Sequence, residues 1–138
     1  MSRMCGQEFQ RSQEEEKILE GFGDVIQLFE KDCEGRLYES YINLGRLFLK
    51  GYGQESDCEL MLRLWKHVGC LVIARIEFIH QRQGNMTELV RLLTAYGKKN
   101  GYRKIIVEAA HSESIQGFLK KHSFLPVEGT LGNWEMEI

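Results

Sequence analysis

The order of elements between residues 70 and 110 constrains the fold more than any other feature of the chain. The run CLVIARIEFI (70–79) is rich in β-branched residues, as a central strand is. A Gly-Asn turn follows, then a helical stripe of Leu89, Leu92, Leu93 and Tyr96 that ends at the strong helix stop Asn100-Gly101. KIIVEAA (104–110) reads as the next strand. The sequence therefore predicts a strand–helix–strand unit whose two strands lie parallel.

The remaining segments extend this unit into a mixed sheet flanked by helices. A helical stripe over residues 12–32 carries Gly21 and Gly23, which weaken or split the helix, and a second amphipathic helix is predicted over 37–48. The alternating segment 58–65 predicts a strand hairpinned to 70–79. A short helix over 112–122, with Ser112 as its N-cap, and strands at SFLPV and NWEMEI complete the chain. We expect an α/β fold in one domain (1–138) with a helix-rich N-terminal part.

Charge and composition exclude several classes of protein. With 43% hydrophobic and 28% charged residues and a net charge of −2, the 138-residue chain resembles neither a nucleic-acid binder nor a membrane-surface protein. No apolar run is long enough to span a membrane, and the scattered cysteines do not form a metal motif. We expect a cytoplasmic protein with reduced thiols, no metal and no membrane partner. A homodimer is left open.

The segment HQRQGNMTELVRLL (80–93) is the best candidate for binding an anion. Gly84 allows a close approach of backbone to a ligand, and the loop precedes a helix N-terminus, where backbone N–H groups and the helix dipole favour negative charge. Arg82 adds a positive charge. The alternative is that Gly84 and Asn85 simply make the turn. Lys98, Lys99 and Arg103, at the far end of the helix, are interpreted as solvated rather than phosphate-binding.

Residues 70–128 resemble the coenzyme-binding half of the GNAT family of N-acetyltransferases. In that family a strand leads into a pyrophosphate loop of the form Q/R-x-x-G-x-G/A and a leucine-rich helix. The matching positions here are Gln81, Arg82, Gln83, Gly84, Asn85 and Met86. The resemblance implies that this loop binds acetyl-CoA as a co-substrate, and that an acetyl group moves from it to an amine.

Three positions, Met86, Leu119 and Ser123, depart from the family pattern; Ser123 stands where the family has the glycine of a Gly-Phe pair after the short helix. Met86 replaces the small residue at the end of the loop, so its side chain would intrude where backbone should approach. The short helix of many members carries a tyrosine that protonates the leaving thiolate, and by spacing that position is Leu119 here, next to Phe118. Tyr96 and Tyr102 would replace this acid only if the helix end turned toward the thiol.

Two residues are candidates for acid–base chemistry. Glu77, on the predicted central strand, would be a general base that deprotonates the amine; the alternative is a surface carboxylate paired with Arg75 or Arg63. His111 follows KIIVEAA, where α/β folds place ligand-facing groups, and it is otherwise an exposed polar residue.

These observations lead to two functional interpretations. The first is a small GNAT-like N-acetyltransferase that uses acetyl-CoA and a small-molecule or protein amine as acceptor. The second is a catalytically inactive GNAT-fold binding or regulatory protein, which the Leu119 and Met86 departures favour. The sequence has no basic stripe with interleaved aromatic residues, so it does not support a nucleic-acid-directed role.

Overall fold

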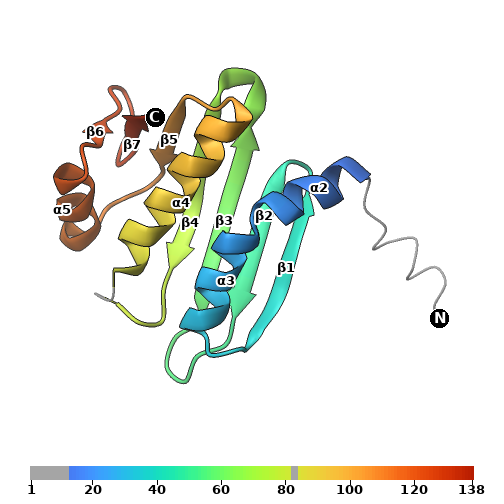
Figure 1. Ribbon diagram of the computed structural model, residues 1–138. Coiled ribbons are helices and arrows are strands. Elements are labelled where there is room, and N and C mark those ends of the chain that lie inside the picture. Colours follow the sequence, from blue (N-terminus) through green and yellow to red (C-terminus); the bar gives the residue numbers. More distant parts are fainter. Residues whose placement is uncertain (1–12, 82–83) are drawn as a thin grey trace.

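A seven-stranded sheet forms the centre of the computed structural model, which describes residues 13–81 and 84–138. The strand order is β1-β2-β3-β4-β5-β7-β6, and only β4 and β5 pair in parallel (Figure 1). The strands are β1 (Leu37–Asn43), β2 (Arg46–Gly51), β3 (Cys58–Trp65), β4 (Cys70–Glu77), β5 (Lys104–Val107), β6 (Leu125–Pro126) and β7 (Trp134–Glu137). The predicted α/β class, the hairpin of β3 with β4 and the parallel pairing of β4 with β5 are confirmed.

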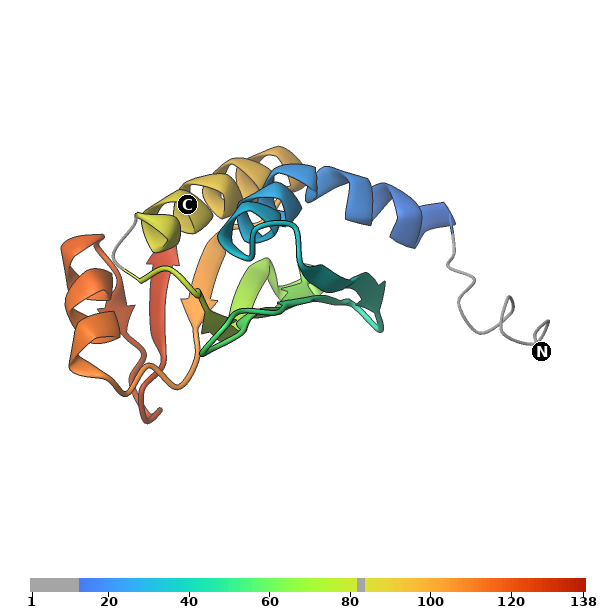
Figure 2. The ribbon, with the colours of Figure 1, turned by 90° about the horizontal axis from the view of Figure 1, so that it is seen from below.

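The helices lie where the apolar stripes predict them. They are α2 (Gln13–Gly21), α3 (Gly23–Asp32), α4 (Asn85–Asn100) and α5 (Glu113–Lys121), with a single turn η1 (Lys66–Val68) between β3 and β4. The split between α2 and α3 falls at the predicted glycine pair. A Cβ at Gly21 would lie 3.1 Å from the Tyr96 ring, so glycine lets α2 approach α4 closely. Figure 2 shows α2, α3 and α4 together on one face of the sheet.

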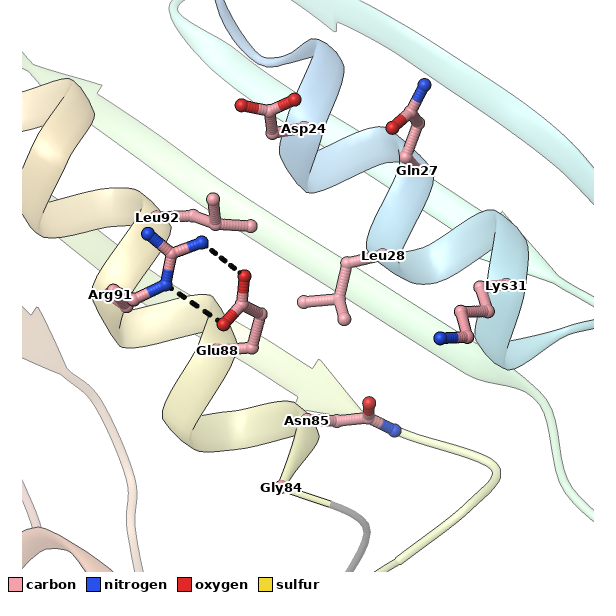
Figure 3. A pocket seen from close by; sticks show the side chains of 9 residues that line it. All are labelled: Asp24, Gln27, Leu28, Lys31, Gly84, Asn85, Glu88, Arg91 and Leu92. Atoms are coloured by element: carbon pink, nitrogen blue, oxygen red, sulfur yellow. Dashed lines mark hydrogen bonds and ion pairs between the residues drawn. The ribbon is translucent and has the colours of Figure 1, made fainter.

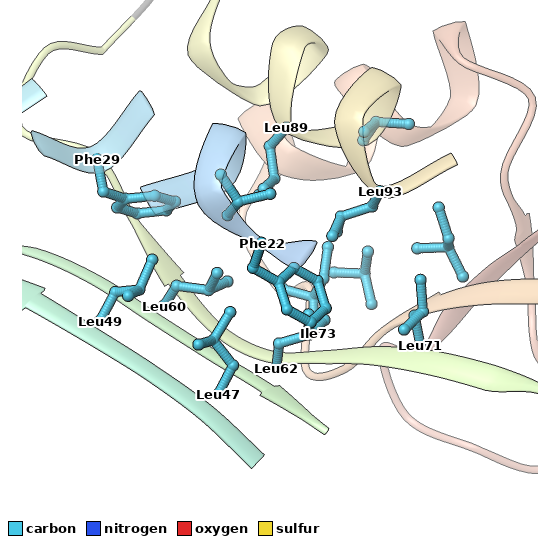
Figure 4. Packing of buried hydrophobic residues seen from close by; sticks show 14 of the residues in the cluster. Phe22, Phe29, Leu47, Leu49, Leu60, Leu62, Leu71, Ile73, Leu89 and Leu93 are labelled. Carbon is cyan, nitrogen blue, oxygen red and sulfur yellow. The ribbon is translucent and has the colours of Figure 1, made fainter. Parts of the chain in front are cut away.

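The main core fills the space between those helices and the sheet. Phe22 and Phe29 from the α2–α3 segment meet Leu89 and Leu93 from α4 (Figure 4). The strands contribute the fully buried side chains Leu47, Leu49, Leu60, Leu62, Leu71 and Ile73. The buried residues alternate along β2 and β3 because one face of each strand is buried, whereas the first half of β4 is buried on both faces. No helix within the described residues is long and apolar enough to cross a membrane.

The predicted helix over residues 37–48 is wrong, because these residues form the hairpin of β1 and β2. Leu44, which completes the helical spacing, is 82% exposed at the hairpin turn. Leu44 and Gly45 both have positive φ (53° and 73°), as a two-residue hairpin turn requires. Tyr41 and Phe48 are partners across the hairpin, and their rings stack with centroids 5.1 Å apart. The helical spacing of these apolar residues was therefore coincidental.

Candidate functional site

β4 and β5 separate at their carboxyl ends. Their pairing runs from Cys70↔Lys104 to Ile73↔Val107, and the bond from Glu108 N to Ile73 O (3.0 Å) follows it. β5 then stops, whereas β4 continues to Glu77. The second half of β4 therefore pairs with β3 on one side and, among the described residues, with no strand on the other. An extended ligand can bind the open backbone of β4 there.

A bulge in β4 lies at the point of separation. Leu62 pairs with Ile73 and Met61 pairs with Arg75, so Ala74 is the extra residue. The bulge changes which residues face the core: Ile73 precedes it on the buried face and Ile76 follows on that face. Arg75 and Glu77 are consequently exposed on the opposite face of the sheet.

Glu77 has no ionic partner among the described residues. The sequence offered Arg75 and Arg63 as partners, but Arg75 lies 3.4 Å from Glu59, and Arg63 pairs with Glu108. Glu59 is also the residue directly opposite Glu77 across the β3–β4 ladder. Two carboxylates at facing positions repel each other. Glu77 is thus an exposed carboxylate at the end of β4, and within the described segments no ion pair involves it.

His111 lies in the connection that follows β5. The backbone before it is fixed, because Ala110 N donates to Gly132 O (2.7 Å) and Gln116 Nε2 donates to Ala110 O (2.8 Å). A Cβ at Gly132 would lie 2.7 Å from His111 Cε1, so the β6–β7 connection packs against the imidazole. His111 and Glu77 both follow the carboxyl ends of the parallel pair. The predicted cap is confirmed: Ser112 Oγ accepts from Ile115 N at 3.2 Å.

The loop that precedes α4 presents an uncapped helix N-terminus. Gly84 is the N-cap, with φ of 78°, and no described side chain caps the helix. The N–H groups of the first turn, Asn85 to Thr87, have no intrahelical acceptor by position. Among the described residues, a Cβ at Gly84 would meet nothing within 4 Å beyond its chain neighbours. Gln81 donates to Phe78 O (2.6 Å), and Arg82 and Gln83 lie outside the described residues.

The Met86 side chain does not intrude into the loop as the sequence predicts. It is partly buried and packs against the hydrophobic core. The reason is its place in α4: Met86 is three and seven residues before Leu89 and Leu93, which puts it on the buried face of the helix. Its backbone N–H remains in the uncapped first turn.

A cavity of about 590 Å³ adjoins this helix end, between α3 and α4 (Figure 3). Lys31 of α3 lines it opposite Gly84 and Asn85, and Arg91 lines it while paired with Glu88. Lys31 is exposed and is the cation that the sequence analysis missed. Its charge gave no signal in the sequence, because it lies more than fifty residues from the loop and is placed beside it only by helix packing.

The tyrosines offered as replacement acids lie at the other end of α4. Tyr102 is 7% exposed, and burial raises its pKa to about 12. Tyr96 stacks on Phe22 with ring centroids 4.1 Å apart. On the short helix, Leu119 is fully buried, and the Phe118 ring stacks against His122. None of these residues places an acid near the separation of β4 and β5.

No group of three or more potential metal ligands occurs in the described part of the chain. Cys33, Cys58 and Cys70 are buried free thiols. Burial, together with Cys33, raises the pKa of Cys58 to about 12, which keeps that sulfur protonated and a poor ligand or nucleophile.

Solved structures share this fold at low sequence identity. Tetrahymena GCN5 is 12% identical, with 92% of this chain and 90% of that chain covered and a TM-score of 0.51. A probable acetyltransferase of the GNAT family from Chromobacterium violaceum ATCC 12472 is 13% identical, with coverage of 91% and 82% and a TM-score of 0.50. A GNAT family acetyltransferase from Elizabethkingia anophelis, solved with acetyl-CoA bound, is 14% identical over 84% and 83%, with a TM-score of 0.48.

No family model matches the chain, and no curated protein matches it significantly. At these identities the structural likeness establishes the fold alone. The chain has the mixed-sheet α/β fold of the GNAT structures, as its sequence resemblance predicts.

Proposed function

We propose that this protein is an N-acetyltransferase that binds acetyl-CoA between the separated ends of β4 and β5. The observation that carries the proposal is the coincidence of two features at one end of the sheet. There, among the described residues, the edge of β4 that faces β5 has no partner strand beyond Ile73, and α4 has no side-chain cap at its N-terminus, Gly84. An extended thioester arm suits the first feature, and a diphosphate suits the second.

The chain's own residues fit the anionic part of such a coenzyme. The backbone N–H groups of Asn85, Met86 and Thr87 would donate to diphosphate oxygens, and the positive end of the α4 dipole would favour their charge. Lys31 lies across the adjoining cavity and would add a cation. Gly84 itself has no side chain, and a Cβ at this position would meet none of the described atoms within 4 Å beyond its chain neighbours. Gln81, Arg82 and Gln83 complete the loop by resemblance to the family.

The coenzyme would supply an activated acetyl group as a thioester. The acceptor amine attacks the carbonyl carbon, so a C–N bond forms and the C–S bond breaks without a covalent enzyme intermediate. A free N–H on the open side of β4 would hold the carbonyl oxygen as its negative charge develops. The reaction therefore needs a base for the amine more than it needs a nucleophile.

Glu77 is the proposed base. An ammonium cannot attack until it loses a proton, and a carboxylate without an ionic partner can accept that proton directly or through water. His111 is the second candidate, at the carboxyl end of the other strand of the pair. With Leu119 in the core, the thiolate would leave without a tyrosine acid. A thiolate with a pKa near that of cysteine, roughly 8.5, can do so.

The competing proposal is a GNAT-fold protein that binds the coenzyme without transferring its acetyl group. The residue types at positions 118 and 119 favour it, because neither Phe118 nor the buried Leu119 can donate a proton from the short helix.

The two proposals are separated by turnover. Purified protein would be mixed with acetyl-CoA and a panel of small amines and lysine-containing peptides. Free thiol release and acetylated product would both be followed. A transferase gives product that depends on the amine, whereas binding of acetyl-CoA without any product supports the inactive alternative.

A further inference from the structure

Asp32, the last residue of α3, is hydrogen-bonded to the segment between β4 and α4. Its Oδ2 accepts from Ile79 N (2.7 Å), and its Oδ1 accepts from His80 N (3.0 Å). Asn85, the first residue of α4, donates its side-chain amide to the same Oδ1 at 3.3 Å and to His80 O at 3.2 Å. One carboxylate thus reaches both ends of the loop that leads to the uncapped helix N-terminus.

The side chain of His80 adds to this attachment. Its Nδ1 lies 3.1 Å from Asp32 Oδ1, and its Nε2 lies 3.9 Å from Glu34. Just before it, the Phe78 ring stacks on Phe29 of α3, with centroids 4.7 Å apart. The C-terminal turn of α3 therefore holds the start of the loop through apolar and polar contacts together.

The position of Asp32 is energetically unfavourable without these donors. Its side chain is fully buried, and it is the one charged residue buried within the described segments. It also ends a helix, where the dipole disfavours negative charge. A buried carboxylate costs stability unless hydrogen bonds compensate it. All the described donors to Asp32 belong to the β4–α4 segment, so the compensation comes from the loop alone.

We propose that Asp32 is a positioning residue for the coenzyme loop: it holds Ile79, His80 and Asn85 so that the N-terminus of α4 faces the diphosphate. This rests on the proposed coenzyme site. Asp32 does not touch the ligand; it acts through the backbone that does. When an anchored loop becomes an ensemble, the apparent Kd rises in inverse proportion to the fraction of time that the loop spends in place.

Asp32→Asn is the test, with Glu30→Gln as its matched control. Glu30 is also an α3 carboxylate that accepts a backbone N–H, from Leu37 at 3.3 Å, but none of its hydrogen bonds within the described residues reaches the β4–α4 segment. Asp32→Asn should speed hydrogen exchange at the Ile79 and His80 amides. It should raise the Kd or KM for acetyl-CoA by about tenfold, as expected for a loop in place about a tenth of the time. The kcat at saturating acetyl-CoA should change less than twofold, and Glu30→Gln should change none of these.

Several outcomes would overturn the proposal. If Asp32→Asn frees the two amides but binds acetyl-CoA as the unaltered protein does, Asp32 is structural only, and the proposed function still stands. If the unaltered protein itself binds no acetyl-CoA, the proposed function fails together with this role. Should Asp32→Asn not fold, His80→Ala provides the test, because it removes the ring contacts with Asp32 and Glu34 but keeps the His80 backbone N–H. A rise in Kd of about two- to fivefold is expected, and an unchanged Kd refutes the positioning role.

Discussion

Replacing Gly84 with glutamate tests the proposed diphosphate site most selectively. Gly84 has φ of 78°, a conformation that costs other residues about 1–2 kcal/mol. A Cβ at this position meets nothing within 4 Å, so a side chain causes no clash in the free protein. A loss of coenzyme affinity beyond the loss caused by backbone strain at this position therefore comes from the charge of the glutamate beside the ligand.

The size of that loss follows from Coulomb's law. A carboxylate about 5 Å from one phosphate charge is repelled by about 1–3 kcal/mol for effective dielectric constants between roughly 80 and 20. This corresponds to a rise in Kd of roughly 5- to 150-fold. The effect should shrink as salt is added, because exposed charges are screened.

Two control variants separate charge from backbone strain. Gly84→Ala introduces the strain without the charge. Gly129→Glu introduces both, at a position with φ of 80° and open space around the Cβ, but in the β6–β7 connection. Isothermal titration calorimetry with acetyl-CoA at low and high salt should rank Gly84→Glu far weaker than either control. Equal affinities for Gly84→Glu and Gly84→Ala would refute the placement of the diphosphate.

Three further perturbations have defined outcomes. Glu77→Gln should slow acetyl transfer by about 10²–10⁴-fold and remove the acidic limb of the pH–rate profile, whereas Glu39→Gln, on the same face of the sheet, should do neither. Met86→Ala should lower the free energy of unfolding by about 1–2 kcal/mol, because the side chain is partly buried against the core. Coenzyme binding should not tighten; tighter binding would show that the Met86 side chain obstructs the loop. Because burial raises the pKa of Tyr102 from 10.0 to about 12, its neutral form contributes stability that is complete below about pH 10 and is lost as the pH rises through about 12. Tyr102→Phe should make denaturant midpoints fall less over that interval.

The second half of the fold was predictable because each element has its own local signal. Each of these signals involves only a few neighbouring residues, and all three are confirmed: the β-branched run forms β4, Gly101 ends α4, and Ser112 caps α5. The β1–β2 hairpin was missed because Leu44, an apolar residue, occupies a turn position that favours glycine or asparagine. The alternation of Leu47, Leu49 and Gly51 on the buried face was the available signal.

The site was only partly predictable for a different physical reason. Gly84 and the N-terminus of α4 are neighbours in sequence, so their pattern is visible there. Asp32 and Lys31 reach the same loop from α3 through tertiary packing, which no local pattern encodes. Strand register also decides which carboxylates pair with Arg63 and Arg75.

Titration of the unaltered, amide-labelled protein with acetyl-CoA tests the central claim most directly. We expect saturable binding with a Kd below about 1 mM, within the usual range for enzyme substrates. The largest NMR shifts should fall on the backbone amides of residues 84–87 and 74–77, with smaller changes at the far end of α4 near Tyr102. No saturable binding at millimolar acetyl-CoA, or shifts confined to other parts of the chain, would contradict the account.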